Sequence, residues 1–324
     1  MRDVSVLTIA RGREAHLHNV IRGLAAQTVP PRELVIAAMQ DELYDGLPDV
    51  PFPIHQIQVT RPDGELPLAA ARNAVAAKAS GAVLAFVDVD CIPHPELVAD
   101  VTEACHDGRG LVMGEVAYLP KGATDGGLDF DHFDKIGVKH SDRQGPPAEG
   151  LRYCEDYRCF WSLNFAIHRA DWERSGGFDK GYFGYGGEDT DFGRVLDARG
   201  IDIWWMKGAK VYHQYHDHCM PPIHHVEAVV RNAEYFATRW GHRTMGHWLH
   251  AFHLMGLIDN SEDALTILRA PDEADFEMCR QTGDMPYANS RRLMDKLLRD
   301  LDTEEERRAA AQAGEDRISA IAAE

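Results

Sequence analysis

Two aspartates separated by one residue follow an apolar stretch, and their spacing suits metal chemistry. Asp88 and Asp90 come after the run 82–87, which has the composition of a buried strand. In an extended chain alternate side chains share a face, so both carboxylates point toward the ligand-binding edge of a sheet. Such acids either cap the next helix, which Pro93 and Pro95 introduce, or bind a cation. The motif by itself fits both interpretations.

A second group of acids follows a glycine-rich segment, FGYGGEDTDF at 183–192. Glycines allow positive φ and let the backbone pass close to a ligand. Glu188, Asp189 and Asp191 stand at the start of a helix predicted over 189–199, where carboxylates are electrostatically favoured. A capping cluster explains one acid but not three, so we predict that this segment contacts a ligand.

The third group is a set of histidines in VYHQYHDH at 211–218. If the strand predicted there continues, His216 and His218 share one face and His213 lies on the other. Histidines gathered near a strand end can ligate a metal, although this spacing matches no zinc module. A separate zinc site that uses Cys219 stays an alternative.

These groups need a scaffold that brings strand ends together. Strand-like runs at 4–10, 34–38, 54–59, 82–87 and 111–118 alternate with helical patterns at 17–28, 68–80 and 95–105. This alternation predicts an α/β fold with a doubly wound, mainly parallel sheet and ligands at the carboxyl ends of its strands. Residues 120–150 show little periodicity and predict a long loop, of the kind that is usually functional or mobile. Beyond His224 the pattern is helical.

The charge and composition exclude several classes of partner. The 324 residues are 44% hydrophobic and carry 52 acidic against 34 basic groups, a formal charge of −18. Such a chain repels nucleic acids and anionic lipids, and it needs a divalent cation to bind a diphosphate. We expect no transmembrane segment and no signal peptide. Six scattered cysteines without CxxC spacing predict reduced thiols in a cytoplasmic protein.

Taken together, the motifs resemble GT-A glycosyltransferases of family 2 whose second half is similar to the galactosyltransferase and chondroitin-polymerase group. The pieces that carry the resemblance occur in order over the first two-thirds of the chain: Arg72-Asn73, FVDVDCIPHPEL at 86–97, GGFD at 176–179, GYGGEDTDF at 184–192 and VYH at 211–213. The resemblance implies a GT-A (Rossmann-like) catalytic domain over 1–222, with a nucleotide-binding half at about 1–118 and an acceptor-binding half at about 119–222. A helical extension over 223–324 would follow, and its helices could join two copies of the chain.

The resemblance also implies roles for individual residues. Asp90 and His213 would bind Mn²⁺ or Mg²⁺, with His216 as the alternative histidine, and Asp88 would contact the metal or the ribose. Asp189 would be the general base. The donor-binding residues would be Thr8, Ala10, Arg11, Arg72, Asp88 and Val89, and the acceptor-binding residues Glu188, Tyr185, Gly187 and Asp191. Trp161 is predicted as an acceptor platform because sugars stack on aromatic faces, whereas Trp204 and Trp205 are predicted to be core.

The implied activity is metal-dependent, inverting transfer of a hexose from a nucleotide-diphosphate donor, a UDP-sugar, to a hydroxyl of a carbohydrate or other acceptor. A metal neutralises the leaving diphosphate, and a carboxylate that takes the acceptor proton contributes ~10²–10⁴-fold. The family commonly ends its second strand with Asp-Asp-Gly-Ser, whereas Ala38-Met39-Gln40-Asp41 stands here. The resemblance therefore does not decide which nucleotide base the donor carries. The alternatives are a non-catalytic carbohydrate- or nucleotide-binding protein and a sugar-nucleotide pyrophosphorylase, although residues 10–13 are too short for the Gly-rich loop of the latter.

Overall fold

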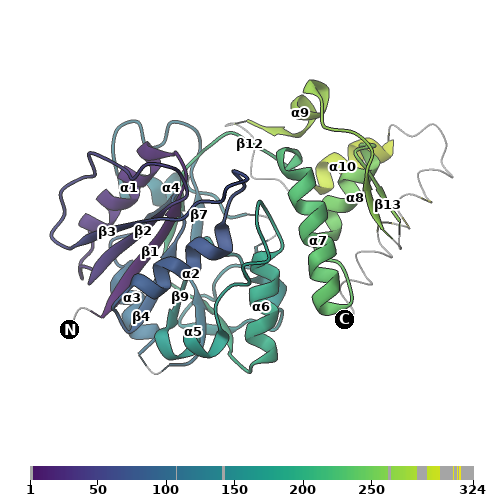
Figure 1. Ribbon diagram of the computed structural model, residues 1–324. Coiled ribbons are helices and arrows are strands. Elements are labelled where there is room, and N and C mark those ends of the chain that lie inside the picture. Colours follow the sequence, from purple (N-terminus) through teal and green to yellow (C-terminus); the bar gives the residue numbers. More distant parts are fainter. Residues whose placement is uncertain are drawn as a thin grey trace. The chain divides into compact units, whose positions relative to one another are not determined.

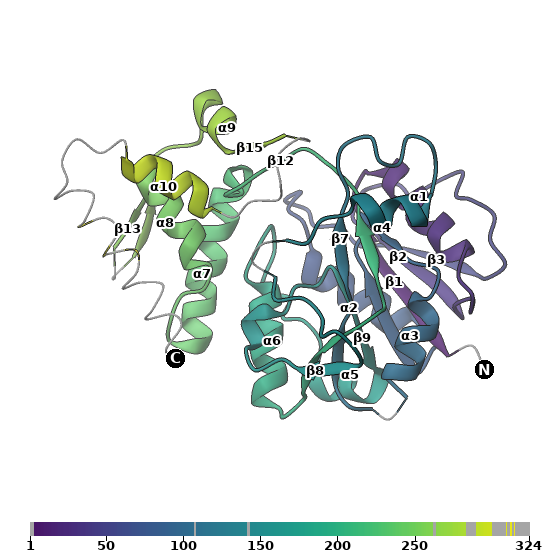
Figure 2. The ribbon, with the colours of Figure 1, turned by 180° about the vertical axis from the view of Figure 1, so that it is seen from behind.

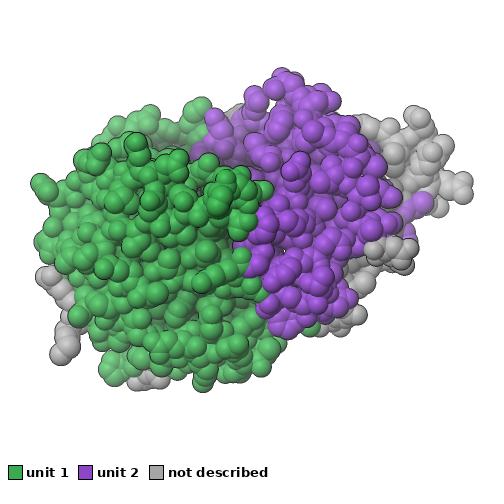
Figure 3. All heavy atoms as spheres, in the orientation of Figure 1, with its two compact units in different colours: residues 1–180, 188–215 green, residues 181–187, 216–324 purple. Residues whose placement is uncertain are grey.

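In the computed structural model the chain folds into two compact units (Figure 3). Unit 1 comprises residues 1–180 and 188–215, and unit 2 comprises residues 181–187 and 216–324. The structure describes residues 3–106, 108–140, 143–261, 264–282 and 290–299, together with 309, 312 and 314. The Ala- and charge-rich stretch from Thr303 therefore lies almost entirely outside the described residues. The functional boundary at residue 222 stays a prediction, and residues 181–187, which include the glycines of the segment 183–192, group with unit 2.

Unit 1 is built around an eight-stranded sheet of order β3-β2-β1-β4-β9-β6-β10-β8 (Figure 1). The neighbours β3, β2, β1 and β4 are parallel, as are β6 and β10, whereas β9 and β8 are antiparallel to their neighbours. The predicted α/β fold is confirmed. The strands are β1 (Val4–Ala10), β2 (Glu33–Ala38), β3 (Ile54–Gln58), β4 (Val83–Val87), β6 (Leu111–Met113), β8 (Leu151–Tyr153), β9 (Asn164–His168) and β10 (Ile203–Met206).

Helices cover both faces of this sheet because the central strands are apolar on both sides. Figure 1 shows α2 and α6 over one face, and Figure 2 shows α3 over the opposite face. On the first face, Leu7 and Phe86 of the sheet share a core with Val75, Trp172 and Phe192 of the helices. The helices of unit 1 are α1 (Glu14–Ala25), α2 (Leu68–Lys78), α3 (Leu97–Ala104), α4 (Phe130–Ile136), η1 (Tyr157–Cys159), α5 (Arg169–Ser175) and α6 (Glu188–Ala198).

A second, three-stranded sheet in unit 1 has the order β5-β11-β7, formed by β5 (Cys91–Pro93), β11 (Val211–His213) and β7 (Val116–Tyr118). The single strand predicted over 111–118 is therefore wrong, because β6 and β7 belong to different sheets. The break falls at Gly114, against which the Ala209 carbonyl and the Asn164 amide pack so closely that a side chain would collide with both. The chain leaves the large sheet where only glycine fits.

The loop predicted over 120–150 contains a helix, α4, so the prediction of an irregular segment is wrong for that part. The Asp129 side chain caps α4 by accepting a hydrogen bond from the His132 backbone N–H. Phe133 of α4 is fully buried against Tyr212 of β11. After the helix, backbone hydrogen bonds in both directions pair Val138 with Tyr118 at the end of β7. The second part of the loop is thereby held beside the small sheet.

Unit 2 has a helical core formed by α7 and α8, and apolar side chains including Val229, Leu249 and Phe252 fill it. The prediction of helix throughout this region is wrong at two places, where the pairs β12–β15 and β13–β14 form small antiparallel sheets. Among the described residues, none of the helices has both the length and the apolar character needed to cross a bilayer. The elements are β12 (His218–Cys219), η2 (Ile223–His225), α7 (Val226–Trp240), α8 (Gly246–Leu254), β13 (Ile258–Asn260), β14 (Leu265–Ile267), α9 (Glu273–Cys279), β15 (Arg280–Gln281) and α10 (Arg291–Arg299).

Candidate active site

The small sheet of unit 1 brings Asp90 and His213 together. In its register His213, the last residue of β11, is paired with Cys91 of β5, and Asp90 directly precedes Cys91. The backbone N–H of Gln214 donates to the Asp90 carbonyl at 2.7 Å and fixes this arrangement. As a result His213 Nε2 lies 3.6 Å from Asp90 Oδ1, and both residues are buried.

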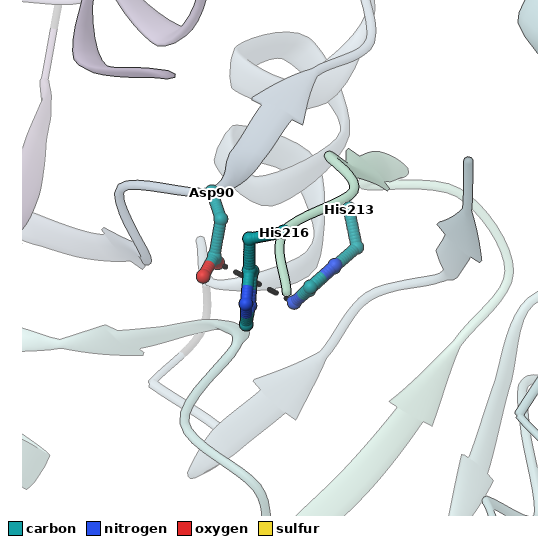
Figure 4. A group of neighbouring side chains, drawn as sticks. All are labelled: Asp90, His213 and His216. Atoms are coloured by element: carbon teal, nitrogen blue, oxygen red, sulfur yellow. Dashed lines mark ion pairs between the residues drawn. The ribbon is translucent and has the colours of Figure 1, made fainter. Parts of the chain in front are cut away.

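His216 completes a group of three side chains that could hold a metal ion (Figure 4). One ligand atom from each of Asp90, His213 and His216 lies within 4.8 Å of the others. His216 is the first residue that groups with unit 2, and it follows His213 by only three residues. The sequence analysis placed the two histidines on opposite faces if the strand continued, but β11 ends at His213, so both can turn toward Asp90. His218 and Cys219 are not part of this group.

The three side chains fit a divalent cation. A carboxylate oxygen and two imidazole nitrogens are ligands of Mn²⁺ and related ions, and three protein ligands leave positions for a substrate. The Asp90 carboxylate already pairs with a positively charged side chain: Arg13 Nη1 lies 2.5 Å from Asp90 Oδ2. Arg13 follows β1 and adopts the left-handed conformation, with φ 50°, which few residues other than glycine adopt. Sequence reasoning missed Arg13, although it stands in the polar segment after the first strand.

Beside the metal group, three acids surround the buried guanidinium of Arg72. Arg72 Nη2 lies 3.6 Å from Asp88 Oδ1, and Nη1 lies 3.4 Å from Glu188 Oε1 and 3.8 Å from Asp189 Oδ1. Arg72 comes from α2, Asp88 follows β4, and the other two acids begin α6. The structure thus brings together residues separated by more than a hundred positions. One cation faces three acids, so the group carries excess negative charge.

This crowding changes the protonation of two of the acids. Burial raises the pKa of Glu188 to about 7, and the nearby charge of Asp189 acts in the same direction. Burial likewise raises the pKa of Asp88 to about 7; Arg72 opposes this shift, and Asp90 and Asp189 add to it. The influence of both Asp90 and Asp189 on Asp88 shows that the metal group and the acids of α6 lie close enough to interact. Carboxyl groups with such raised pKa values are typical of functional sites.

Asp189 is held in a definite orientation by Ser162. The Ser162 backbone N–H and its Oγ donate to Asp189 Oδ2 at 3.0 and 3.1 Å. The other oxygen, Oδ1, is buried and accepts no hydrogen bond from the described residues. One oxygen is therefore fixed while the second keeps its capacity to accept a proton. Sequence reasoning missed Ser162, which gives no signal beyond its place before β9.

Apart from Arg72, which comes from α2 and faces the acids of α6, the predicted donor-binding residues lie at or near the carboxyl ends of β1 and β4. Thr8 and Ala10 are buried in β1, and the Thr8 hydroxyl finds no hydrogen-bond partner among the described residues. Val89 is buried between the two aspartates, whereas Arg11 is exposed and donates to the Gly64 carbonyl at 2.8 Å. A pocket of about 410 Å³ lies between the segments that follow β1 and β2, and none of the predicted donor-binding residues lines it. Its lining residues are Gly12, Arg13, Glu14, Gln40, Glu42, Leu43, Tyr44 and Asp45. Arg13 joins this pocket to Asp90.

The predicted acceptor-binding residues fall in both units. In unit 1, Asp191 is fully buried, and Trp161 is partly exposed with its ring 5.2 Å from that of His140. In unit 2, the Tyr185 ring stacks on His225 and Trp248, at centroid distances of 4.7 and 5.8 Å. This packing within unit 2 competes with the acceptor contact that was predicted for Tyr185.

The glycine-rich segment has the positive φ values that the sequence predicted. They are 77° at Gly184, 90° at Gly186 and 91° at Gly187. The close approach at Gly186 and Gly187 is to protein side chains of unit 2, Met245 and Tyr182, and the predicted contact of this segment with a ligand stays a prediction. The Asn232 side-chain amide of α7 also donates to the carbonyls of residues 183, 185 and 186. In the core, Trp205 is fully buried as predicted, whereas Trp204 is partly exposed.

Comparison with known proteins identifies the class. Residues 5–148 match the model of glycosyl transferase family 2, and residues 148–217 match the model described as the N-terminal domain of galactosyltransferase. TarS of S. aureus has a similar structure, with a TM-score of 0.51 and 14% identity over 78% of this chain and 43% of that chain. This likeness concerns the fold alone. Residues 5–217 thus resemble family 2 glycosyltransferases in their first part and galactosyltransferases in their second, on a GT-A-like fold, and the resemblance found in the sequence is confirmed.

Two groups of curated relatives add to this result. Two proteins of Streptomyces hygroscopicus, both named validoxylamine A glucosyltransferase, are 29% and 28% identical over 230 residues, or 62% of this chain. Glycosyltransferase AglE of Haloferax volcanii is 26% identical over 144 residues, which make up 43% of this chain and 47% of AglE. The matches to the Streptomyces proteins cover 49% and 52% of their length, so this chain spans about half of the relatives it matches.

Proposed function

We propose that this chain transfers a sugar from a nucleotide-diphosphate donor to an acceptor hydroxyl, with inversion at the anomeric carbon and Asp189 as the general base. The observation that carries the proposal is the arrangement at Asp189. Ser162 fixes one carboxylate oxygen, and the other has no hydrogen-bond donor among the described residues. A hydroxyl is a poor nucleophile until a carboxylate takes its proton, a contribution of ~10²–10⁴-fold.

In this mechanism the residues around Arg72 prepare the acceptor side. Arg72 lies nearest to Glu188 among the three acids, and together they fix the start of α6 and hence the direction of Asp189. Glu188 is proposed to bind an acceptor hydroxyl beside the one that reacts, and Trp161 to stack on the acceptor ring. Asp189 accepts the proton of the attacking hydroxyl as its oxygen bonds to the anomeric carbon. A single displacement with one base on the acceptor side inverts that carbon.

On the donor side, Asp90, His213 and His216 are proposed to hold a divalent cation, which when bound neutralises charge on the leaving diphosphate. Two imidazoles in the ligand set favour Mn²⁺ over Mg²⁺, because Mg²⁺ prefers oxygen ligands throughout. Asp88 would contact the cation or the ribose, and Thr8, Ala10, Arg11 and Val89 would line the nucleoside site. The pocket between the ends of β1 and β2 is lined by Gly12 and Arg13, which directly follow Arg11, but by none of these four residues, so it supports the edge of the sheet as the nucleoside region and not their individual roles. Gly187, Tyr185 and Asp191 stay predicted acceptor contacts.

The donor and acceptor are proposed from the relatives. Because two of them are named validoxylamine A glucosyltransferase, nucleotide-activated glucose and validoxylamine A form the first pair to test. UDP-sugars come first among the donors, as the resemblance implies, and GDP- and ADP-sugars follow because Gln40 departs from the acid that the family commonly has at the end of the second strand. The acceptor class is a carbohydrate or another molecule with a free hydroxyl.

The decisive test compares Asp189→Asn with the wild-type protein. We expect the variant to bind nucleoside diphosphate with unchanged affinity in calorimetry and to lose at least a hundredfold in transfer, with NMR of the wild-type product showing the inverted anomer. Retained turnover in the variant would remove Asp189 from the mechanism. Asp90→Ala should abolish the Mn²⁺-dependent part of donor binding, and binding unaffected by this change would remove Asp90 as a ligand.

The same assays separate the alternatives. Slow Mn²⁺-dependent hydrolysis of a nucleotide-sugar without acceptor is expected of a transferase and not of a non-catalytic binding protein. Formation of a nucleotide-sugar from a nucleoside triphosphate and a sugar phosphate, with release of pyrophosphate, would instead identify a pyrophosphorylase.

A further inference from the structure

Arg143, in the second part of the long loop of unit 1, has a cationic group without an acidic partner among the residues that the structure describes. Its guanidinium lies over the Trp205 ring, 5.2 Å from the centroid, and Nη2 is 3.5 Å from the Gly114 carbonyl. Nη1 is shielded from solvent and has no hydrogen-bond partner among the described residues. No carboxylate among them lies within ion-pair distance of Arg143, although the chain has 52 acids and only 34 basic groups.

A structural role for this charge does not explain the site. Burial lowers the pKa of Arg143, the direction expected when the surroundings compensate a cation poorly, and the groups that oppose the shift most are phenol and thiol side chains, not acids. A buried charge is unfavourable unless it is paired. An apolar side chain of similar size would pack on Trp205 without that cost. The arginine therefore points to a ligand that supplies negative charge.

The position of Arg143 connects it to the metal group through Tyr118. The Tyr118 side chain hydrogen-bonds to Arg143, and its ring packs on that of His213 at a centroid distance of 4.7 Å. His213 Nε2 in turn lies 3.6 Å from Asp90 Oδ1. Gly114, which accepts from Arg143, directly follows β6 at the same edge of the sheet where Asp88 and Asp90 follow β4. A ligand that reaches the metal group is thus close to the guanidinium.

We propose that Arg143 binds a phosphoryl oxygen in the active site, and that this oxygen belongs to the diphosphate of the donor. The inference rests on the proposed function. When the bond between the anomeric carbon and the diphosphate breaks, the leaving oxygen takes the electron pair, and Arg143 donates hydrogen bonds to the diphosphate without giving up a proton. A phosphorylated acceptor would offer the same chemistry, so the test separates these two sources.

The test measures binding of uridine, guanosine, UDP and GDP by calorimetry, with Mn²⁺ and with chelator, to wild type, Arg143→Met and Arg174→Gln. Arg174 is an exposed residue of α5, paired with Asp171, and its variant removes the same charge outside the site. For the nucleotide that binds, we expect Arg143→Met to weaken the diphosphate at least tenfold and to leave the nucleoside unchanged, because a hydrogen bond to a charged group is lost. Arg174→Gln should bind both as wild type does.

Thermal unfolding of the ligand-free proteins decides whether Arg143 is merely structural. We expect the melting temperature of Arg143→Met to equal or exceed that of wild type, and a clear fall would assign the residue to packing and overturn the proposal. The second source is tested with inorganic phosphate at saturating UDP or GDP. If Arg143→Met keeps full affinity for the diphosphate but loses the stabilisation by phosphate seen in wild type, the oxygen comes from the acceptor. If it loses neither, Arg143 is not an anion site.

These outcomes differ from failure of the proposed function. If Arg143→Met binds UDP, GDP and phosphate as wild type does while Asp189→Asn abolishes transfer, the inference fails and the function stands. If wild type binds no nucleoside diphosphate and no phosphate, both fail.

Discussion

Two arginines of unit 1 have the same stacking and opposite electrostatic surroundings. The guanidinium of Arg72 lies 5.2 Å from the centroid of the Phe178 ring, and that of Arg143 lies 5.2 Å from the centroid of the Trp205 ring. Around Arg72 stand three carboxylates within 3.8 Å, whereas no described carboxylate pairs with Arg143. One region has too much negative charge for its single cation, and the other has a cation with no counterion in the part of the chain that the structure describes.

The comparison indicates which charge each region lacks. Burial alone would lower the pKa of Arg72, but Asp189, Asp88 and Glu188 outweigh it and raise the pKa, so this arginine is an integral part of the fold. Burial lowers the pKa of Arg143, as expected for a cation that no described acid compensates. A metal-bound diphosphate would bring a cation to the acidic side and phosphoryl oxygens to Arg143. The excess of negative charge around Arg72 thus complements the metal ion, and the positive charge of Arg143 complements the diphosphate of the proposed donor.

The largest expected effect is on stability, in the variant Arg72→Met. Removing the cation leaves three acids in a buried cluster without their partner, and breaking a buried ion pair in this way costs about 3–5 kcal/mol. We expect the free energy of unfolding, measured in urea at pH 8, to fall by about that amount. Arg143→Met is the matched control, because it removes the same guanidinium from an aromatic ring at the same centroid distance. Its free energy of unfolding should not fall. Equal losses in both variants would show that the two arginines do not differ as proposed.

A smaller effect concerns the pH dependence of the acidic region. The pKa of Glu188 is raised to about 7, so between its ordinary value of 4.5 and 7 the folded protein binds more protons than the unfolded chain. Stability contributed by the protonated form is therefore present at low pH and lost as pH rises through 7. Compared with Glu188→Gln, which cannot titrate, wild type should lose on the order of 2 kcal/mol of unfolding free energy between pH 5 and pH 8.

The control for this prediction is Glu173→Gln, which removes a carboxyl group of α5 for which the structure gives no such burial. Its unfolding free energy should follow that of wild type at each pH. If the difference between Glu188→Gln and wild type stays constant from pH 5 to pH 8, the raised pKa of Glu188 is wrong, and the acids around Arg72 are better compensated than the comparison supposes.

Much of the fold could be predicted because the strands of the large sheet are apolar runs with clear ends. Where the prediction was wrong, tertiary contacts decided. Leu111 to Tyr118 is apolar throughout, and only the approach of the Ala209 carbonyl to Gly114 divides it into two strands. The helix around Phe133 is short and polar, and it is stabilised by burial against Tyr212, a contact that periodicity cannot reveal.

The candidate site likewise contains residues that could be predicted from the sequence and residues that could not. Acids after a strand or at a helix start could be found by position, and the structure brings Asp88, Asp90, Glu188, Asp189 and His213 to one region of unit 1. The residues that sequence reasoning missed act by long-range contacts. Arg13, Ser162 and Arg143 belong to no recognisable motif, and each becomes visible only through its partner: Asp90, Asp189 and Trp205, respectively. An arginine without an acidic partner has no signature in a sequence.

The smallest effect is expected for Ser162→Ala, which removes one hydrogen-bond donor to Asp189 from the acidic region. The backbone N–H still donates to Asp189 Oδ2 at 3.0 Å, so only the second hydrogen bond, from Oγ at 3.1 Å, is lost. We expect a loss of about 1 kcal/mol in stability and a fall in kcat of about fivefold with KM for the donor unchanged. Ser162→Thr keeps the hydroxyl and should restore most of kcat. If alanine and threonine lower kcat equally, Ser162 contributes packing rather than orientation, and Asp189 is held in place by Arg72 and by its own helix.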